Sequence, residues 1–212
     1  MEIKRFEFNY FGENTYVIWD KTSKEAAIVD PGMVNPDEVS EIESYISGNS
    51  LDLKYILLTH IHIDHTFGID ALKSHYGVKV YAHKADEPLG QTRSEQAQRF
   101  HLPVGLGPVN VDRYIADGDM LKLGKEDIKV IHTPGHSQGG VCYYVPDSRF
   151  ILTGDTLFNR SIGRTDLPGG NQRQLILSIR TKLLELPTAT VVYPGHGPST
   201  TIGEEEQFNP FL

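Results

Sequence analysis

A repeated local pattern constrains the fold of this chain more than any other feature of its sequence. A short hydrophobic run ends in a turn that carries histidine or aspartate, and this occurs four times, at residues 54–65, 128–136, 150–155 and 190–196. The runs have the length and the β-branched or aromatic character of buried strands. Because strands that end at one edge of a sheet bring their last residues together, the pattern predicts a layered α/β structure with a functional site at that edge.

The densest group of these polar residues is the sequence His-Ile-His-Ile-Asp-His, directly after the first hydrophobic run. Residues two apart in an extended segment point to the same side, so His60 and His62 are expected to reach one metal ion together. Asp64 and His65 follow where the chain turns toward a helix, and we expect them to face the same cavity. Imidazole and carboxylate ligands suit zinc, and also iron or manganese.

Three further metal-capable residues follow later strands. His136 lies in Thr-Pro-Gly-His-Ser, Asp155 in Thr-Gly-Asp-Thr-Leu-Phe, and His196 in Pro-Gly-His-Gly. Each has a glycine beside it, which lets the backbone turn sharply and approach a ligand closely. The other four histidines lack such a turn or precede it, and we expect them to be structural or exposed: His75, His83, His101 and His132.

Hydrophobic periodicity predicts the remaining elements. Strands are expected at 3–8, 15–19, 26–29, 54–58, 78–82, 120–123, 128–132, 141–145, 150–152 and 190–193. Helices are expected at 36–47, 68–76 and 175–184. Residues 84–110 are less regular, with helices starting near 84 and 94 and a loop rich in Pro and Gly at 103–108. A long segment of this kind in a compact domain predicts the wall or lid of a pocket.

Composition excludes several classes of protein. The chain has 212 residues, 39% hydrophobic and 23% charged, which fits one globular domain over residues 1–212. Its formal net charge of -8 disfavours nucleic-acid binding. The sequence shows no signal peptide and no membrane-spanning stretch, and its single cysteine, Cys142, suits a reducing compartment. We therefore expect a cytoplasmic protein with no membrane or nucleic-acid partner, and its oligomeric state stays open.

The ordered set of motifs resembles the metallo-β-lactamase superfamily, and within it the short, single-domain relatives of glyoxalase II (hydroxyacylglutathione hydrolase). The motifs that carry the resemblance span nearly the whole chain and lie at 30–32, 59–65, 117–119, 133–137, 153–158 and 194–197. The resemblance implies an α+β fold, in which two sheets and flanking helices form a four-layer αββα sandwich with the site at one edge. It also implies a small-molecule thioester as the substrate.

The same resemblance implies two divalent metal ions, zinc being the first expectation. The first ion would be held by His60, His62 and His136, and the second by Asp64, His65 and His196. Asp155 would bridge both ions, because two neighbouring cations need a shared anion between them.

A metal pair of this kind supports hydrolysis. Metal coordination lowers the pKa of water to about 7, so a bridging hydroxide is available as a nucleophile at neutral pH. A metal ion would stabilise the developing oxyanion, and Asp64 and Asp155 would serve catalysis at the centre. A thiolate leaves without a strong general acid because its thiol has a pKa of about 8.5. Thioesters such as S-D-lactoylglutathione are therefore the expected substrates.

Three departures from the larger glyoxalase II enzymes concern the substrate. Those enzymes carry a C-terminal helical domain that helps to hold glutathione, and this chain ends about 16 residues after His196, so we expect that domain to be absent. Their Gly-His-Glu-Tyr is Gly-His-Gly-Pro here, and their Gly-Lys-x-Tyr is Gly-Arg-Thr-Asp. Arg164 is predicted to pair with a substrate carboxylate, and Asp166 and Phe158 are further predicted substrate contacts. A loop-bracing ion pair between Arg164 and Asp166 is the alternative.

The motifs leave other functions open. Gly-Arg-Thr-Asp also occurs in persulfide dioxygenases of the superfamily, in which His60, His136 and Asp155 alone would hold one Fe(II) ion. A lactonase or a β-lactamase is a further enzymatic alternative, although no export signal favours the latter. A non-catalytic metal-binding module is the third alternative. Seven ligands without a thiolate are, however, more typical of an open site with solvent than of a structural one.

Overall fold

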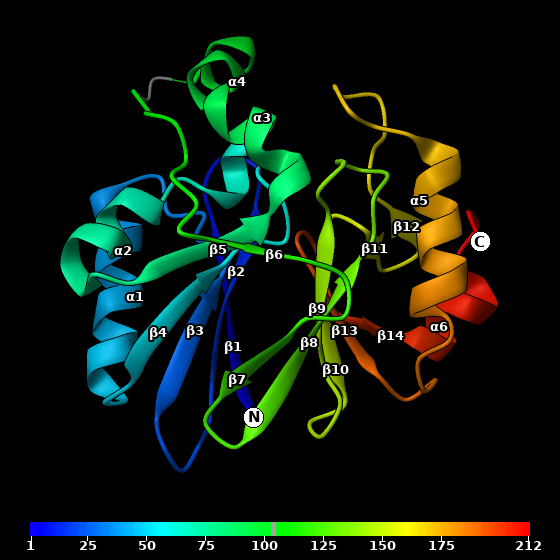
Figure 1. Cartoon of the computed structure of the whole chain (residues 1–212), viewed down its shortest axis with the longest axis horizontal. Helices are drawn as coiled ribbons and strands as arrows, with labels where there is room; N and C mark the ends of the chain where they lie inside the picture. Colours follow the sequence, from blue (N-terminus) through cyan, green and yellow to red (C-terminus); the bar gives the residue numbers. More distant parts are fainter. Residues whose placement is uncertain (103–104) are drawn as a thin grey trace.

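Two six-stranded sheets packed face to face form the centre of the protein (Figure 1). The computed structural model describes residues 1–102 and 105–212. The strands of the first sheet are β1 (Glu2–Phe8), β2 (Glu13–Trp19), β3 (Glu25–Val29), β4 (Asp52–Leu57), β5 (Lys79–His83) and β6 (Arg113–Ile115). Those of the second are β7 (Met120–Leu123), β8 (Glu126–His132), β9 (Val141–Val145), β10 (Phe150–Gly154), β13 (Val191–Pro194) and β14 (Thr200–Thr201). The first sheet follows chain order, and the second has the order β14-β13-β10-β9-β8-β7.

Helices cover the outer face of each sheet. The first sheet is covered by α1 (Pro36–Gly48) and α2 (Ile69–Tyr76), and the second by α5 (Gln172–Ser178) and α6 (Ile202–Phe208) (Figure 1). The predicted start of the first helix is confirmed. Asn35 caps it, because the Asn35 side chain accepts hydrogen bonds from two backbone N–H groups of the first turn.

Three hydrophobic cores separate these layers, because the strands bury both faces. On β2, Val17 packs in the core shared with α1 and α2, whereas the next residue, Ile18, packs in the core between the sheets. On β10, Leu152 faces the core between the sheets, and Ile151 faces the core shared with α5 and α6. Successive side chains along each strand thus point alternately into two different hydrophobic cores. The structure has the expected four-layer αββα arrangement.

The predicted strands and helices are present, with ends that shift by a few residues. The third predicted helix changes character, because α5 continues as the π-helical turn η3 (Ile179–Leu183). The helix α6, the strands β6 and β14, and the hairpin of β11 (Leu157–Phe158) and β12 (Ser161–Ile162) were not predicted. Two-residue strands are too short to show any period. Within the described parts of the chain, every helix falls short of what crossing a membrane requires.

The irregular segment predicted at 84–110 forms the 3-10 turn η2 (Lys84–Asp86) and the helices α3 (Glu87–Gln91) and α4 (Arg93–Arg99). Residues 103 and 104 of the predicted loop lie outside the described residues. Figure 1 shows α3 and α4 together at the top of the view, beyond the end of the first sheet.

Candidate metal centre

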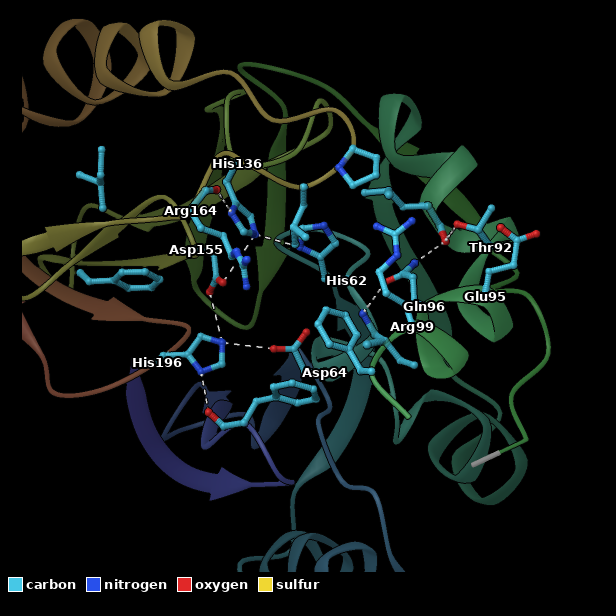
Figure 2. A pocket seen from close by; sticks show the side chains of 18 residues that line it. His62, Asp64, Thr92, Glu95, Gln96, Arg99, His136, Asp155, Arg164 and His196 are labelled. Carbon is cyan, nitrogen blue, oxygen red and sulfur yellow. Dashed lines mark hydrogen bonds and ion pairs between the residues drawn. The ribbon is translucent and has the colours of Figure 1, made fainter. Parts of the chain in front are cut away.

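Four strand ends meet at one edge of the two sheets. β4 leads into the turn at 60–65, β8 leads into the loop that carries His136, and β10 and β13 end shortly before Asp155 and His196. Figure 2 shows Asp155 and His196 beside one another, with His196 facing Asp64. The structure therefore brings together all seven residues predicted as ligands.

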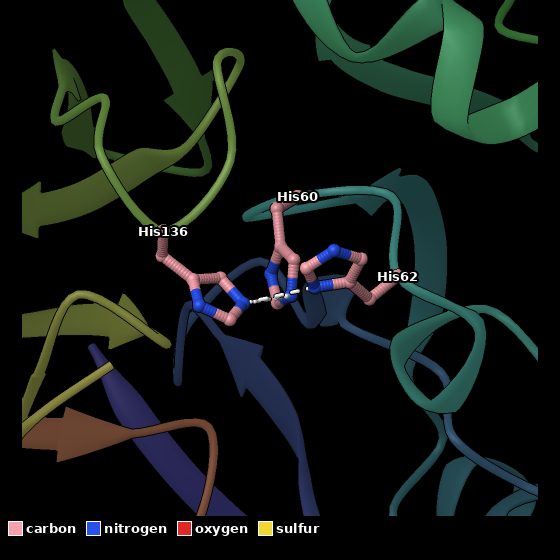
Figure 3. A group of neighbouring side chains, drawn as sticks. All are labelled: His60, His62 and His136. Carbon is pink, nitrogen blue, oxygen red and sulfur yellow. Dashed lines mark hydrogen bonds between the residues drawn. The ribbon is translucent and has the colours of Figure 1, made fainter. Parts of the chain in front are cut away.

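Three imidazoles form the first cluster (Figure 3). The Nε2 atom of His136 lies 2.9 Å from Nδ1 of His62 and 3.2 Å from Nε2 of His60. All three side chains are buried. Ring nitrogens this close cannot all carry protons without repulsion, so a shared cation is the natural occupant of the space between them.

Asp64, His65 and His196 form the second cluster, and their ligand atoms lie within 4.8 Å of one another. The Oδ2 atom of Asp64 is 3.3 Å from Nε2 of His196 and 3.6 Å from Nε2 of His65. Asp155 lies between the clusters. Its Oδ2 is 3.5 Å from Nε2 of His136 and its Oδ1 is 3.4 Å from Nε2 of His65. This is the position that a bridging ligand requires.

Backbone carbonyl groups fix the tautomers of two of these histidines. Nδ1 of His136 lies 2.7 Å from the carbonyl oxygen of Arg164, and Nδ1 of His196 lies 3.2 Å from that of Phe11. A carbonyl oxygen only accepts, so each Nδ1 carries the proton and donates it. The lone pair of each imidazole is therefore on Nε2, which faces the other ligands. Metal-binding histidines are commonly oriented in this way.

Asp30 orients a ligand of each cluster. Its carboxylate accepts hydrogen bonds from the backbone N–H of Thr59 at 2.7 Å, from the Thr59 hydroxyl at 2.6 Å and from Nδ1 of His65 at 3.1 Å. Because the Thr59 hydroxyl donates to Asp30, it accepts from Nδ1 of His60 at 3.1 Å. The sequence motif at 30–32 supported the family resemblance, but no role was predicted for Asp30.

The electrostatics of the clusters fit divalent cations. Burial, together with neighbouring imidazoles, holds the pKa of His60 well below its usual value, and burial lowers the pKa of His62 to about 3. Burial acts to raise the pKa of Asp155, but His65, together with His196 and His136, outweighs this effect and holds the pKa well below its usual value, so the carboxyl stays ionised. Nε2 of His65 and Oδ1 of Asp155 are buried and have no hydrogen-bond partner among the described residues. Despite burial, nearby carboxylates raise the pKa of His65 and of His196, so in the absence of a cation these rings favour the protonated form. A divalent cation would take the place of those protons, beside the neutral rings of His60 and His62 and the ionised Asp155.

A buried carboxyl group that the sequence did not reveal joins the two loops of the first cluster. Asp86 accepts hydrogen bonds from the backbone N–H of Ile61 at 3.1 Å, the hydroxyl of Ser137 at 2.8 Å and the backbone N–H of Gly139 at 2.6 Å. Ile61 lies between two predicted ligands, and Ser137 follows a third. Asp86 thus fixes the distance between the turn at 60–65 and the loop of His136.

A cavity of about 570 Å³ opens from the metal centre (Figure 2). Its floor includes His62, Asp64, His136, Asp155 and His196. Its walls are mainly apolar, and they include Phe11, Phe100, Phe158, Ile162 and Leu167. The segment predicted to form a pocket wall does so, because Thr92 and three residues of α4, Glu95, Gln96 and Arg99, line the cavity.

Of the three predicted substrate contacts, Phe158 and Arg164 line this cavity, and Asp166 is not among its lining residues in the described chain. The ring of Phe158 meets that of His196 edge to face, with centroids 6.2 Å apart. The guanidinium of Arg164 donates two hydrogen bonds of 2.8 Å to the carboxylate of Asp166. The structure thus shows the alternative to the predicted substrate contact, an ion pair within the loop.

The residues expected to be structural lie outside the clusters. Cys142 is buried, and burial raises the pKa of its thiol to about 11. His83 and His132 stack with ring centroids 4.1 Å apart, and Nε2 of His132 donates to the carbonyl oxygen of Gln138. These contacts brace the loop that carries His136.

The chain matches known proteins over nearly its whole length. Residues 9–196 match the family described as "Metallo-beta-lactamase superfamily". The "Hydroxyacylglutathione hydrolase GloC" of Haemophilus influenzae is 40% identical over an alignment 219 positions long, which covers 100% of this chain and 98% of that protein. The crystal structure of the BLEG-1 B3 metallo-beta-lactamase superposes with a TM-score of 0.90 at 35% identity, covering 100% of this chain and 99% of that one. TTHA1623 in a di-iron-bound form gives a TM-score of 0.87 at 36% identity, covering 99% and 100%. The chain therefore belongs to the metallo-beta-lactamase superfamily.

Proposed function

We propose that this chain hydrolyses thioesters of a small thiol carrier at a two-metal centre, with S-D-lactoylglutathione as the representative substrate. Membership of the superfamily and the ligand clusters make it a metal-dependent hydrolase. One observation carries the proposal of thioester hydrolysis. Two ligand clusters, joined by Asp155, converge on the floor of a largely apolar cavity. Similarity to a protein named hydroxyacylglutathione hydrolase supports a thioester as the substrate.

The side chains of this protein prepare the centre for that reaction. When bound, divalent cations act as Lewis acids and acidify a water molecule at neutral pH. Asp155 would hold both ions, and the protons fixed on Nδ1 of His136 and His196 keep the Nε2 lone pairs aimed at them. The apolar walls around Phe11 and Phe158 would orient the acyl group over the centre and limit the access of bulk water. A thiolate leaving group, with a thiol pKa of about 8.5, needs no strong acid from the protein.

A persulfide dioxygenase with one iron ion is the second candidate. The Gly-Arg-Thr-Asp sequence favours it, and in this structure that sequence forms the paired loop of Arg164 and Asp166. A single-iron site would use only His60, His136 and Asp155. The second cluster is also formed, with all its ligand atoms within 4.8 Å of one another, so we favour the two-metal hydrolase.

The test is turnover of S-D-lactoylglutathione, followed as loss of thioester absorbance, by protein loaded with zinc, iron or manganese. We expect saturable hydrolysis that is lost on chelation and restored when the metal is returned. Absence of hydrolysis with all three metals would contradict the proposal. Oxygen consumption by the iron-loaded protein with glutathione persulfide would then favour the dioxygenase, and cleavage of a chromogenic β-lactam would favour a lactamase.

A further inference from the structure

Two charged side chains on one wall of the cavity have no part in the proposed hydrolysis. Glu95 and Arg99 lie one helical turn apart on α4, and both line the cavity. Residues four apart on a helix face the same side, with Cβ atoms about 5–6 Å apart. Figure 2 shows both residues across the cavity from Asp155 and His196. They are therefore placed to meet the part of a substrate that extends away from the metal centre.

Both charges are available to a ligand. Among the described residues, neither Glu95 nor Arg99 takes part in an ion pair or a side-chain hydrogen bond. By contrast, Arg164 already has its charge matched by Asp166 through two hydrogen bonds of 2.8 Å. Arg99 is thus the cation on the cavity wall that is unpaired and available to a substrate carboxylate.

The helix that carries the pair is fixed to the turn of the metal ligands. The buried guanidinium of Arg93 donates to the carbonyl oxygen of Thr66 at 2.7 Å, and the side-chain oxygen of Gln96 accepts from the backbone N–H of Ile63 at 3.0 Å. Ile63 and Thr66 flank the ligands Asp64 and His65. The distance from the charged pair to the metal centre is therefore set by direct contacts.

We infer that Glu95 and Arg99 select the thiol carrier by binding a carrier end that bears both a carboxylate and an ammonium group, as a free α-amino acid end does. This inference rests on the proposed thioester hydrolysis. Arg99 pairs with the carboxylate and Glu95 accepts hydrogen bonds from the ammonium group. The γ-glutamyl end of glutathione has both groups. A phosphate-rich carrier such as coenzyme A meets one unpaired guanidinium and is repelled by Glu95.

Binding of S-methylglutathione, a thioether that cannot be hydrolysed, tests the inference by calorimetry on the metal-loaded protein. We expect Arg99→Gln and Glu95→Gln each to raise its Kd by roughly fivefold to tenfold, a typical range for losing one charge-assisted contact. Arg180→Gln and Glu41→Gln are matched controls, because they remove the same charges from exposed positions outside the cavity. A Kd for Arg99→Gln equal to that for Arg180→Gln would overturn the inference.

Modified ligands identify which group each side chain binds. N-acetylation of the γ-glutamyl amine removes the ammonium group, so it should weaken binding to the unmodified protein and have little further effect on Glu95→Gln. Tighter binding of S-methyl-coenzyme A than of S-methylglutathione would also overturn the inference. Turnover of S-D-lactoylglutathione by the same preparations separates the two claims. If the unmodified protein hydrolyses S-D-lactoylglutathione but Arg99→Gln binds S-methylglutathione as tightly as the unmodified protein does, only the inference is overturned. If the unmodified protein binds S-methylglutathione but does not hydrolyse the thioester, the proposed function is overturned.

Discussion

Single side chains outside the ligand set determine where the ligand atoms lie. Asp30 contacts His65 directly and His60 through the Thr59 hydroxyl, so one carboxylate orients an imidazole in each cluster. Partners of this kind fix the tautomer and the direction of the lone pair. Gly195 also affects where the ligand atoms lie, because its backbone passes close to two ligands. A Cβ atom at this position would collide with Oδ1 of Asp155 and lie 2.7 Å from Cε1 of His65.

Replacing Asp30 tests this orientation. Asp30→Asn removes one of the two oxygens that accept from Thr59 and His65, so we expect metal affinity to fall by about tenfold to a hundredfold. Competition with a chromophoric chelator measures the affinity. Asp147→Asn, in an exposed turn, is the control. Equal affinities in the two variants would show that Asp30 does not orient the ligands.

Replacing Asp155 tests whether this residue links the two ligand clusters. Asp155→Ala removes the only carboxylate that lies near both His136 and His65 in the described chain, and we expect metal content to fall and hydrolysis to be abolished. Elemental analysis of the purified protein and the thioester assay give the two readouts. Normal turnover in this variant would remove Asp155 from the bridging role.

Most strands and helices were predicted from hydrophobic periodicity, because the apolar pattern of each element is local in the sequence. The periodicity extended the helix at 175–184 without a break, where α5 gives way to a π-helical turn, and it missed α6, whose first turns are rich in glutamate. The seven candidate ligands were predictable because each stands next to a strand end and a turn. The roles of Asp86 and Asp30 were not, because their hydrogen-bond partners lie 25 to 53 residues away in the sequence.

Asp86 connects three elements, and its removal should weaken all of them. Asp86→Ala leaves the buried N–H groups of Ile61 and Gly139 without an acceptor, which costs about 1–3 kcal/mol for each group. We expect the free energy of unfolding of the metal-free protein to fall by roughly 2–4 kcal/mol, measured by denaturant titration. Metal affinity should fall as well, because the two loops lose their fixed distance. This role would be contradicted if Asp86→Ala lowered the free energy of unfolding by less than Asp147→Ala does.

Contacts at both ends of the sandwich hold the two sheets together. The metal ligands join the two sheets at one end. At the other end, Asp20 in the β2–β3 turn accepts from the backbone N–H groups of Thr22 and Ser23, and from that of Lys125 in the β7–β8 turn. The order of strands in the sheets was not predictable, because pairings such as that of β10 with β13 join segments separated by a long loop and a helix.

Asp20 should make stability depend on pH. The hydrogen bond from the backbone of Lys125, followed by that from Ser23, lowers the pKa of the Asp20 carboxyl from 3.8 to about 2. A lowered pKa means that the ionised form stabilises the fold, so this contribution is present above about pH 4 and is lost as the pH falls toward 2. We expect Asp20→Asn to be less stable than the unmodified protein at pH 6 and to show a smaller further loss between pH 4 and 2. Parallel losses in both proteins, followed by denaturant titration, would exclude Asp20 as the cause.

Activity at this centre should require two metal ions joined by Asp155, and a metal titration measures that requirement. Metal-free protein would receive increasing equivalents of zinc, iron or manganese in separate series, and the rate of S-D-lactoylglutathione hydrolysis would be recorded at each step. We predict that activity keeps rising until two equivalents per chain are bound. Full activity at one equivalent, with no change on adding the second, would contradict the two-metal centre.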